Sequence, residues 1–306
     1  MWIFFGLASA FLDAGRNLAM KRNLAKQHTH PIIIAWATVF YALPITASLL
    51  FFRPLPEVQS VFWMAAGAAV ALDVILLFLY TEAVKRTDLS LCLPILAFVP
   101  LFLLISSYFI NGEAPTLVRY FGVSLVMLGA YLLNFDPKTS RWYEPLLAIF
   151  HNTGTAMMFV VALIWGTTSA LHKVAIVASD ALFYTGVAGV SIALIFTILA
   201  VLIDPKALRR SFQPKYALKL APIGLMDGLT ILAQFIGQGM TLSVFVISLK
   251  RTSIVWSALG GALFFKENIG RRVFPILLML AGIVAISFSK VQRLLKRHRY
   301  LRSSCW

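Results

Sequence analysis

Residues 238–267, which read QGMTLSVFVISLKRTSIVWSALGGALFFKE, form the stretch around which the rest of the chain is interpreted. From residue 244 to residue 265 this stretch is apolar or small except for Lys250 and Arg251. At about 1.5 Å per residue it is long enough to cross a bilayer as one helix. A cation near the middle of a membrane helix costs roughly 2.5–3.5 kcal/mol on insertion scales. Such a cost is sustained when the side chain faces protein, water or a ligand, so this helix is the first candidate for a functional element.

The overall composition is that of a polytopic membrane protein. Of the 306 residues, 60% are hydrophobic and only 13% are charged, whereas a soluble domain carries about 25% charged residues. The first apolar segment starts at Trp2 without a preceding basic region or a cleavage site of small residues, so it is interpreted as a membrane span and not as a signal peptide. Cys92 and Cys305 indicate neither a disulfide framework nor a metal site.

We predict an all-α integral membrane protein with about ten transmembrane helices. The predicted spans are residues 2–19, 32–52, 60–83, 89–110, 118–135, 156–177, 181–203, 220–238, 244–265 and 273–289. The longest connection lies between the fifth and sixth spans and contains Pro137 and Pro145. This organisation predicts a first five-helix repeat over residues 1–135, a linker over 136–155, a second repeat over 156–289 and a basic tail over 290–306.

The two predicted halves resemble each other. When Glu113, which follows the fourth span, is superposed on Glu267, which follows the ninth, Asp73 falls on Asp227. Weak internal repetition of a five-helix unit is typical of transporters built from two halves around a site at the membrane midplane. Because five is an odd number, the two copies are expected to insert with opposite orientations, as inverted repeats.

Several segments resemble the EamA-type repeat of the drug/metabolite transporter superfamily. They are the fourth span, DLSLCLPILAFVPLF (residues 88–102), then Gly112 and Glu113, and GAYLL (residues 129–133). The second half is similar through WGTT (residues 165–168), but Ile254 replaces the proline of the pattern and Lys266 replaces its glycine. The resemblance covers nearly the whole chain. It implies an inverted-repeat carrier with cytoplasmic termini and a cavity lined by the first, third, fourth, sixth, eighth and ninth helices.

Charged residues deep in the predicted spans are the main site candidates. There are four cations and three anions: Arg16, Lys173, Lys250 and Arg251, and Asp13, Asp73 and Asp227. One positive charge is left over, which favours an anionic ligand. The spacing of Asp13 and Arg16 allows them to pair on one helix face.

Asp73 and Asp227 have two compatible interpretations. They are candidates for carboxylates that bind a proton or a cation during transport, and they are also candidates for counter-ions of Arg16, Lys250 or Arg251. A carboxylate that is paired with a cation can release it on protonation.

The Lys250–Arg251 pair also has two interpretations. Neighbouring residues on a helix point about 100° apart, so one can face a cavity while the other faces a helix contact. The alternative is that both are structural ion-pair members. A lysine–arginine pair on the ninth helix also resembles the phosphate-binding pair of triose-phosphate translocators, which belong to the same superfamily.

Weaker candidates for the cavity are polar or aromatic residues on the same helices: Tyr80, Trp165, Thr168, Gln234 and Trp256. The sixth helix carries a polar stripe that also includes His172. Hydrogen bonds between helices explain such polar residues about as well as substrate contacts do.

Prolines and glycines predict where helices bend and cross. Pro94 and Pro100 are expected to kink the fourth helix. Gly224 and Gly228 permit a close helix crossing, which is expected to occur within the chain. Both a monomer and a homodimer remain compatible with the sequence.

The predicted function is that of a secondary transporter, or permease, for a small polar metabolite, with an anionic substrate and proton coupling as candidates. No phosphate-binding loop, HExxH or GxSxG motif is present, so no enzyme activity, cofactor or metal is expected. The alternatives are a membrane-embedded enzyme, which would need a larger soluble loop, and a non-transporting sensor or channel, against which the repeat argues. The expected partners are the substrate, membrane lipid and a proton, and no nucleic acid.

The basic residues of the tail and those of two loops predict opposite orientations of the chain in the membrane. The net charge is +15, and the tail after Lys290 carries basic residues without an acid, which favours a cytoplasmic tail in the inner or plasma membrane. With ten spans, the loops that contain Lys21 and Lys26, and Lys206 and Lys219, would then lie outside, against the same rule.

Overall fold

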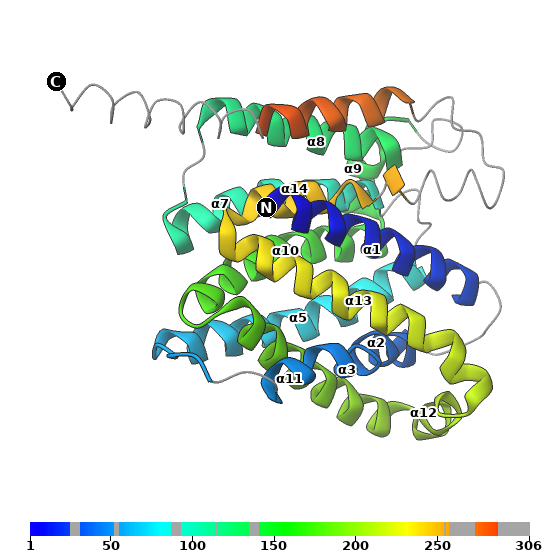
Figure 1. The fold of residues 1–306 in the computed structure, drawn as a ribbon. Coiled ribbons are helices and arrows are strands. Elements are labelled where there is room, and N and C mark those ends of the chain that lie inside the picture. The colour runs from blue at the N-terminus through cyan, green and yellow to red at the C-terminus, as the bar shows by residue number, and fades with distance from the viewer. Residues whose placement is uncertain are drawn as a thin grey trace.

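The computed structural model describes residues 1–24, 31–51, 55–86, 93–113, 116–134, 141–253, 255–256 and 273–286, and every element within these ranges is helical (Figure 1). The elements are α1 (Trp2–Leu24), α2 (Pro31–Phe40), α3 (Leu43–Thr46), α4 (Ser48–Phe51), α5 (Val61–Arg86), the 3-10 helix η1 (Leu93–Phe98), α7 (Val99–Asn111), α8 (Leu117–Asn134), α9 (Glu144–His151), α10 (Thr153–Val177), α11 (Ala181–Ile203), α12 (Pro205–Ser211), α13 (Pro214–Met240) and α14 (Ser243–Lys250). A further helix covers Val273–Ile286. The predicted fold class is confirmed.

Helices of membrane-spanning length and composition lie where the sequence predicts them. Five are long and apolar enough to cross a bilayer, and they are Ile32–Phe51, Val61–Ala83, Thr153–Val177, Ala181–Ile203 and Pro214–Met240. Shorter apolar helices cover Ile95–Asn111, Tyr120–Leu132 and Val273–Ile286. The first predicted span corresponds to α1, which carries Asp13 and Arg16 in its interior.

Two predicted spans are divided at prolines. The second span is divided into α2, α3 and α4, and Pro44 lies in the first turn of α3. The fourth span begins as the 3-10 helix η1, which contains Pro94, and continues as α7, whose first turn contains Pro100. Proline lacks the N–H that would continue the preceding helix, so it is tolerated in a first turn.

The ninth span differs from its prediction, because α14 ends at Lys250 and a turn follows. The Thr252 hydroxyl donates to the Leu249 carbonyl at 2.7 Å, and the Arg251 N–H donates to the carbonyls of Ile247 and Ser248 at 3.2 Å each. The bond to Ile247 continues the helical pattern, whereas the bond to Ser248 and that from the Thr252 N–H to the Leu249 carbonyl at 2.9 Å span three residues and mark a turn, after which helix resumes at Ser253. The prediction of one continuous helix over residues 244–265 is therefore wrong at Arg251, and residues 257–265 lie outside the described ranges.

The helices pack as a bundle in which α10 lies against both α5 and α7, and α1 lies against α13. Helix α14 packs on α1 and α7, so elements of the two predicted halves are interleaved. At one edge of the bundle, α8 lies beside the helix Val273–Ile286, drawn in orange and red (Figure 1). A Cβ atom placed on Gly122 would lie 2.8 Å from the Gly282 carbonyl oxygen, so these two helices cross at close range. The predicted linker is not a plain loop, since it contains α9.

The glycine pair of α13 makes a close crossing inside the chain. A Cβ atom on Gly224 would lie 2.8 Å from the Ala37 carbonyl oxygen of α2, and one on Gly228 would lie 3.2 Å from the carbonyl oxygen of Ala42, just before α3. Both contacts are intramolecular, as expected from the sequence.

We expect Gly224→Ala to destabilise the fold by about 1–3 kcal/mol, because the added methyl group meets backbone that cannot easily move. Thermal unfolding of the purified protein measures this. Gly67→Ala is the matched control, since a Cβ atom there meets nothing within 4 Å. Equal melting temperatures for the two variants would contradict the close crossing.

Candidate substrate site

An ionic cluster lies between α1 and α13. The Arg16 guanidinium contacts the Asp13 carboxylate at 2.6 Å and also forms an ion pair with Asp227 of α13. The side chains of Asp13 and Asp227 are 8% and 7% exposed, so both carboxylates are buried. Arg16 therefore joins the two helices. The pair of Asp13 and Arg16 expected from their spacing is present, and the structure identifies Arg16 as the counter-ion of Asp227.

Lys250 enters the cluster from the last turn of α14. Its Nζ atom donates to Gln234 Oε1 of α13 at 2.7 Å and lies 5.7 Å from the centre of the Trp165 ring of α10. Asp13 and Asp227 both act on it electrostatically. Lys250 thus meets two of the predicted cavity residues, Gln234 and Trp165, while its charge is balanced by carboxylates at longer range.

Arg251 has hydrogen-bonding capacity left and, unlike Arg16, no carboxylate of the described residues within ion-pair distance. Its guanidinium carbon lies 4.7 Å from the centre of the Trp165 ring, which is a cation–π geometry. Its Nε atom is buried without a hydrogen-bond partner, and no acidic side chain of the described residues lies within ion-pair distance. Tyr80 of α5 lies close enough to act electrostatically on both Arg16 and Arg251.

Asp73 of α5 lies in a second group of polar side chains. Its Oδ2 atom is 3.5 Å from His172 Nε2 of α10, and His172 Nδ1 is 2.7 Å from the Tyr184 hydroxyl of α11. Thr168 is buried, and its hydroxyl donates to the Trp165 carbonyl at 3.2 Å. The sequence placed His172 only in a polar stripe and gave no signal for its contact with Asp73, which depends on the rotation of three helices about their axes.

The remaining cavity candidate, Trp256, lies apart from this cluster. It is 41% exposed, and its ring packs edge-on against Phe11 with the ring centres 5.7 Å apart. The cluster residues come from α1, α5, α10, α13 and α14. These helices correspond to the first, third, sixth, eighth and ninth spans, five of the six that the family resemblance implied.

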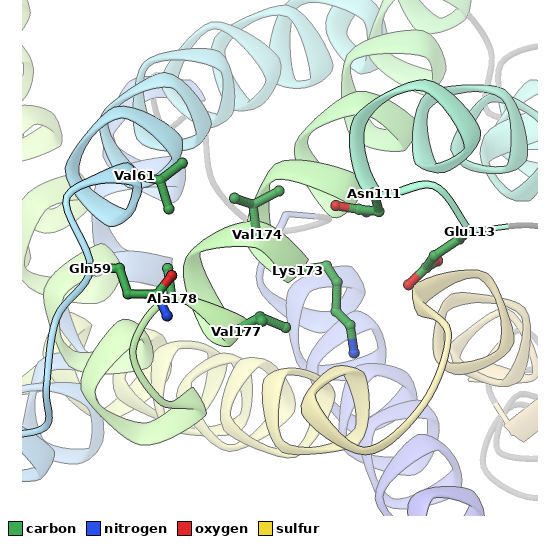
Figure 2. A pocket seen from close by; sticks show the side chains of 8 residues that line it. All are labelled: Gln59, Val61, Asn111, Glu113, Lys173, Val174, Val177 and Ala178. Atoms are coloured by element: carbon green, nitrogen blue, oxygen red, sulfur yellow. The ribbon is translucent and has the colours of Figure 1, made fainter.

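Lys173 belongs to the end of the bundle and not to the central cluster. Its Nζ atom donates to the carbonyls of Gln238 and Thr241, the latter at 2.9 Å. It lines a pocket of about 240 Å³ together with Glu113, Asn111 and Gln59 (Figure 2). Burial raises the pKa of the Glu113 carboxyl, and nearby Lys173 opposes this shift.

The position of Lys173 changes the balance of charges at the centre. Without it, the ionic cluster and the neighbouring group around Asp73 together contain, among the described residues, three cations and three anions: Arg16, Lys250 and Arg251, and Asp13, Asp73 and Asp227. Their formal charges cancel when His172 is neutral. When the two groups are counted together no positive charge is left over, so recognition of an anion rests on the geometry of Arg251.

The apolar spans, the packed bundle and the buried ionic cluster define the class of the protein, a multi-pass α-helical membrane protein with a polar centre. The comparisons define the family. Residues 1–135 match the model of the EamA-like transporter family. Residues 1–135 therefore carry an EamA-like transporter domain, which indicates a membrane transporter and not an enzyme. The superfamily predicted from the sequence is confirmed.

A solved structure titled "Crystal structure of protein" has the same fold. The TM-score is 0.72 at 17% sequence identity, and the alignment covers 94% of this chain and 97% of that one. At this identity the likeness concerns the fold alone. Among curated proteins, none matches this chain.

Proposed function

We propose that this transporter is a secondary carrier that moves a small polar metabolite with an anionic group by alternating access. The observation that carries this proposal is the state of Arg251, a partly buried side chain whose guanidinium carbon lies 4.7 Å from the centre of the Trp165 ring and which has no ion-pair partner among the described residues. A guanidinium presents its N–H groups in a planar fork that matches the two oxygens of a carboxylate or phosphate. Stacking on Trp165 orients the plane and leaves the N–H groups at its edge free to donate.

Lys250 complements Arg251 in this proposal. It supplies a compact positive charge, and Gln234 fixes the position of its Nζ atom at 2.7 Å. Because both cations contact the face of Trp165, an anion bound to Arg251 would also lie within the field of Lys250.

The balanced charges of the cluster support proton coupling. When a monoanion enters a site of zero net charge and low dielectric, it adds an uncompensated negative charge, which is unfavourable. A proton that binds to one of the cluster carboxylates at the same time restores neutrality. Asp73 and Asp227 are the candidates for this carboxylate.

The burial of the cluster supports alternating access. Asp13 and Asp227 are buried, and Lys250 is only 8% exposed, so a substrate reaches them only after the helices around the cluster separate. The turn at Arg251 and the 3-10 segment η1 are interruptions at which such a change can occur.

A thermal-shift screen of the full-length protein tests the proposed substrate class. We expect pools of small carboxylates and phosphates to raise the melting temperature, because a ligand that binds only the folded state at about 100 times its Kd contributes about 2.7 kcal/mol. Neutral and cationic pools are the controls. Stabilisation by neutral or cationic compounds alone would contradict an anionic substrate.

We also propose that the tail after Lys290, which lies outside the described residues, is cytoplasmic in the inner or plasma membrane. Its basic residues without an acid support this orientation, while the basic loops at the opposite end oppose it. A reporter fused after Arg302 is expected to be active only if it works in the cytoplasm. Activity only of a reporter that works outside the cytoplasm would overturn the assignment.

A further inference from the structure

We propose that Asp73 is the carboxylate that takes up the coupling proton, and that His172 and Tyr184 position it for this role. This inference rests on the proposed function, which requires one proton for each bound anion. It assigns the proton to one of the two symmetry-related carboxylates and adds two positioning residues from other helices.

The partners of the two carboxylates differ. Asp227 is paired with the permanently charged guanidinium of Arg16, so loss of its negative charge would break an ion pair between α1 and α13. Asp73 has no guanidinium or ammonium group of the described residues within ion-pair distance, and its contact is with the imidazole of His172. Asp73 can therefore gain a proton without leaving a buried cation unpaired.

Exposure also favours Asp73 as the acceptor. The Asp73 side chain is 21% exposed, whereas the His172 side chain is 6% exposed and Tyr184 is fully buried. Of the three side chains, Asp73 therefore has the most accessible surface at which a proton can arrive.

The three side chains fix where the proton binds. The Tyr184 hydroxyl, 2.7 Å from His172 Nδ1, donates to that nitrogen and leaves the ring hydrogen on Nε2, which faces Asp73 Oδ2. The incoming proton then forms an O–H bond at Oδ1. His172 stays neutral in both states, so the charge of this group changes from −1 to zero with one proton bound.

The surroundings contain few other charges. Helix α14 contributes Lys250, which acts electrostatically on both Asp73 and His172. Helix α13 contributes Phe235, whose ring lies 4.9 Å from the His172 ring and 5.0 Å from the Tyr184 ring. Thr168 of α10, whose hydroxyl donates to the Trp165 carbonyl, adds no charge. Within the described ranges, Lys250 is thus the charge whose balance changes when Asp73 is protonated.

Infrared spectroscopy of the full-length protein in lipid tests this assignment without any substrate. In spectra recorded between about pH 5 and pH 9, we expect a carboxylic-acid C=O band that appears as the pH falls. Asp73→Asn should remove it, and Asp227→Asn should retain it. A band that persists in Asp73→Asn would overturn the proposal. If that variant does not fold, Asp73→Ser removes the carboxyl group in a smaller side chain and is expected to give the same loss.

The positions of His172 and Tyr184 are tested by the frequency of the same band. We expect the double change His172→Leu with Tyr184→Phe to shift the band to higher wavenumber, because the carboxyl group loses its polar contact with the imidazole Nε2 and no hydroxyl is left without a partner. Tyr184→Phe alone is the control and should retain the band near its original frequency. An unshifted band in the double variant would exclude His172. Because no substrate is present, these results are independent of whether Arg251 binds an anion.

Discussion

Arg251→Lys is expected to weaken the binding of an anionic substrate by about 10–100-fold, because a charged hydrogen bond of the guanidinium fork contributes roughly 1.5–3 kcal/mol. The positive charge remains, so insertion and folding should be preserved. The substrate-free melting temperature should therefore change little, while the increase in melting temperature caused by an anionic compound from the screen becomes smaller.

Lys250→Gln, measured by the same shift in melting temperature, tests the effect of charge separately from that of the guanidinium geometry. It removes a point charge and keeps a side chain that can still contact Gln234. We expect it to reduce affinity for anionic compounds more than for neutral ones. If Arg251 and Lys250 are only structural partners of the carboxylates, Arg251→Lys is nearly silent, and the changes that remove charge only destabilise. Binding and melting measured on the wild type, both single variants and the double variant distinguish these accounts.

Asp227→Asn is expected to destabilise the protein by about 3 kcal/mol, because it leaves the partly buried Arg16 with one carboxylate instead of two. Asp73→Asn should be much milder in stability, since neutral His172 needs no counter-ion, and should instead abolish the pH dependence of transport. Asp227→Asn is therefore expected to impair transport more severely than Asp73→Asn.

A double-mutant cycle with Arg16→Gln tests the reason for this difference. If the ion pair of Arg16 and Asp227 carries the effect, the double variant should be more stable than the sum of the two single losses predicts. Additive losses would show that the two residues act separately. Equal, mild effects of Asp73→Asn and Asp227→Asn would contradict the unequal roles assigned to them.

The sequence predicted the features that depend on local spacing. Asp13 and Arg16 are three residues apart, and this places them on one helix face whatever the tertiary packing. The lengths of the apolar segments predicted the spans because a bilayer sets the length of a helix that crosses it. The matched positions of Asp73 and Asp227 also identified two carboxylates that lie in the polar groups between the helices.

Features that depend on depth and helix rotation could not be predicted in the same way. The sequence places Lys173 near an interface, where its amine can snorkel, but it does not reveal that the amine donates to the carbonyls of Gln238 and Thr241. Trp256 follows Arg251 closely in sequence, yet the turn directs it to the outer surface. The contact between Asp73 and His172 joins residues almost 100 positions apart, and one chain without related sequences gives no signal for such a pair.

Uptake into proteoliposomes tests the central claim most directly. The protein is reconstituted, a labelled anionic compound from the screen is added outside, and uptake is measured with and without an inward proton gradient. We predict accumulation that depends on both the protein and the gradient, and that falls at least about 10-fold in Arg251→Lys at low substrate concentration. Uptake that is indifferent to the gradient and unchanged in Arg251→Lys would contradict a proton-coupled carrier that recognises anions at Arg251.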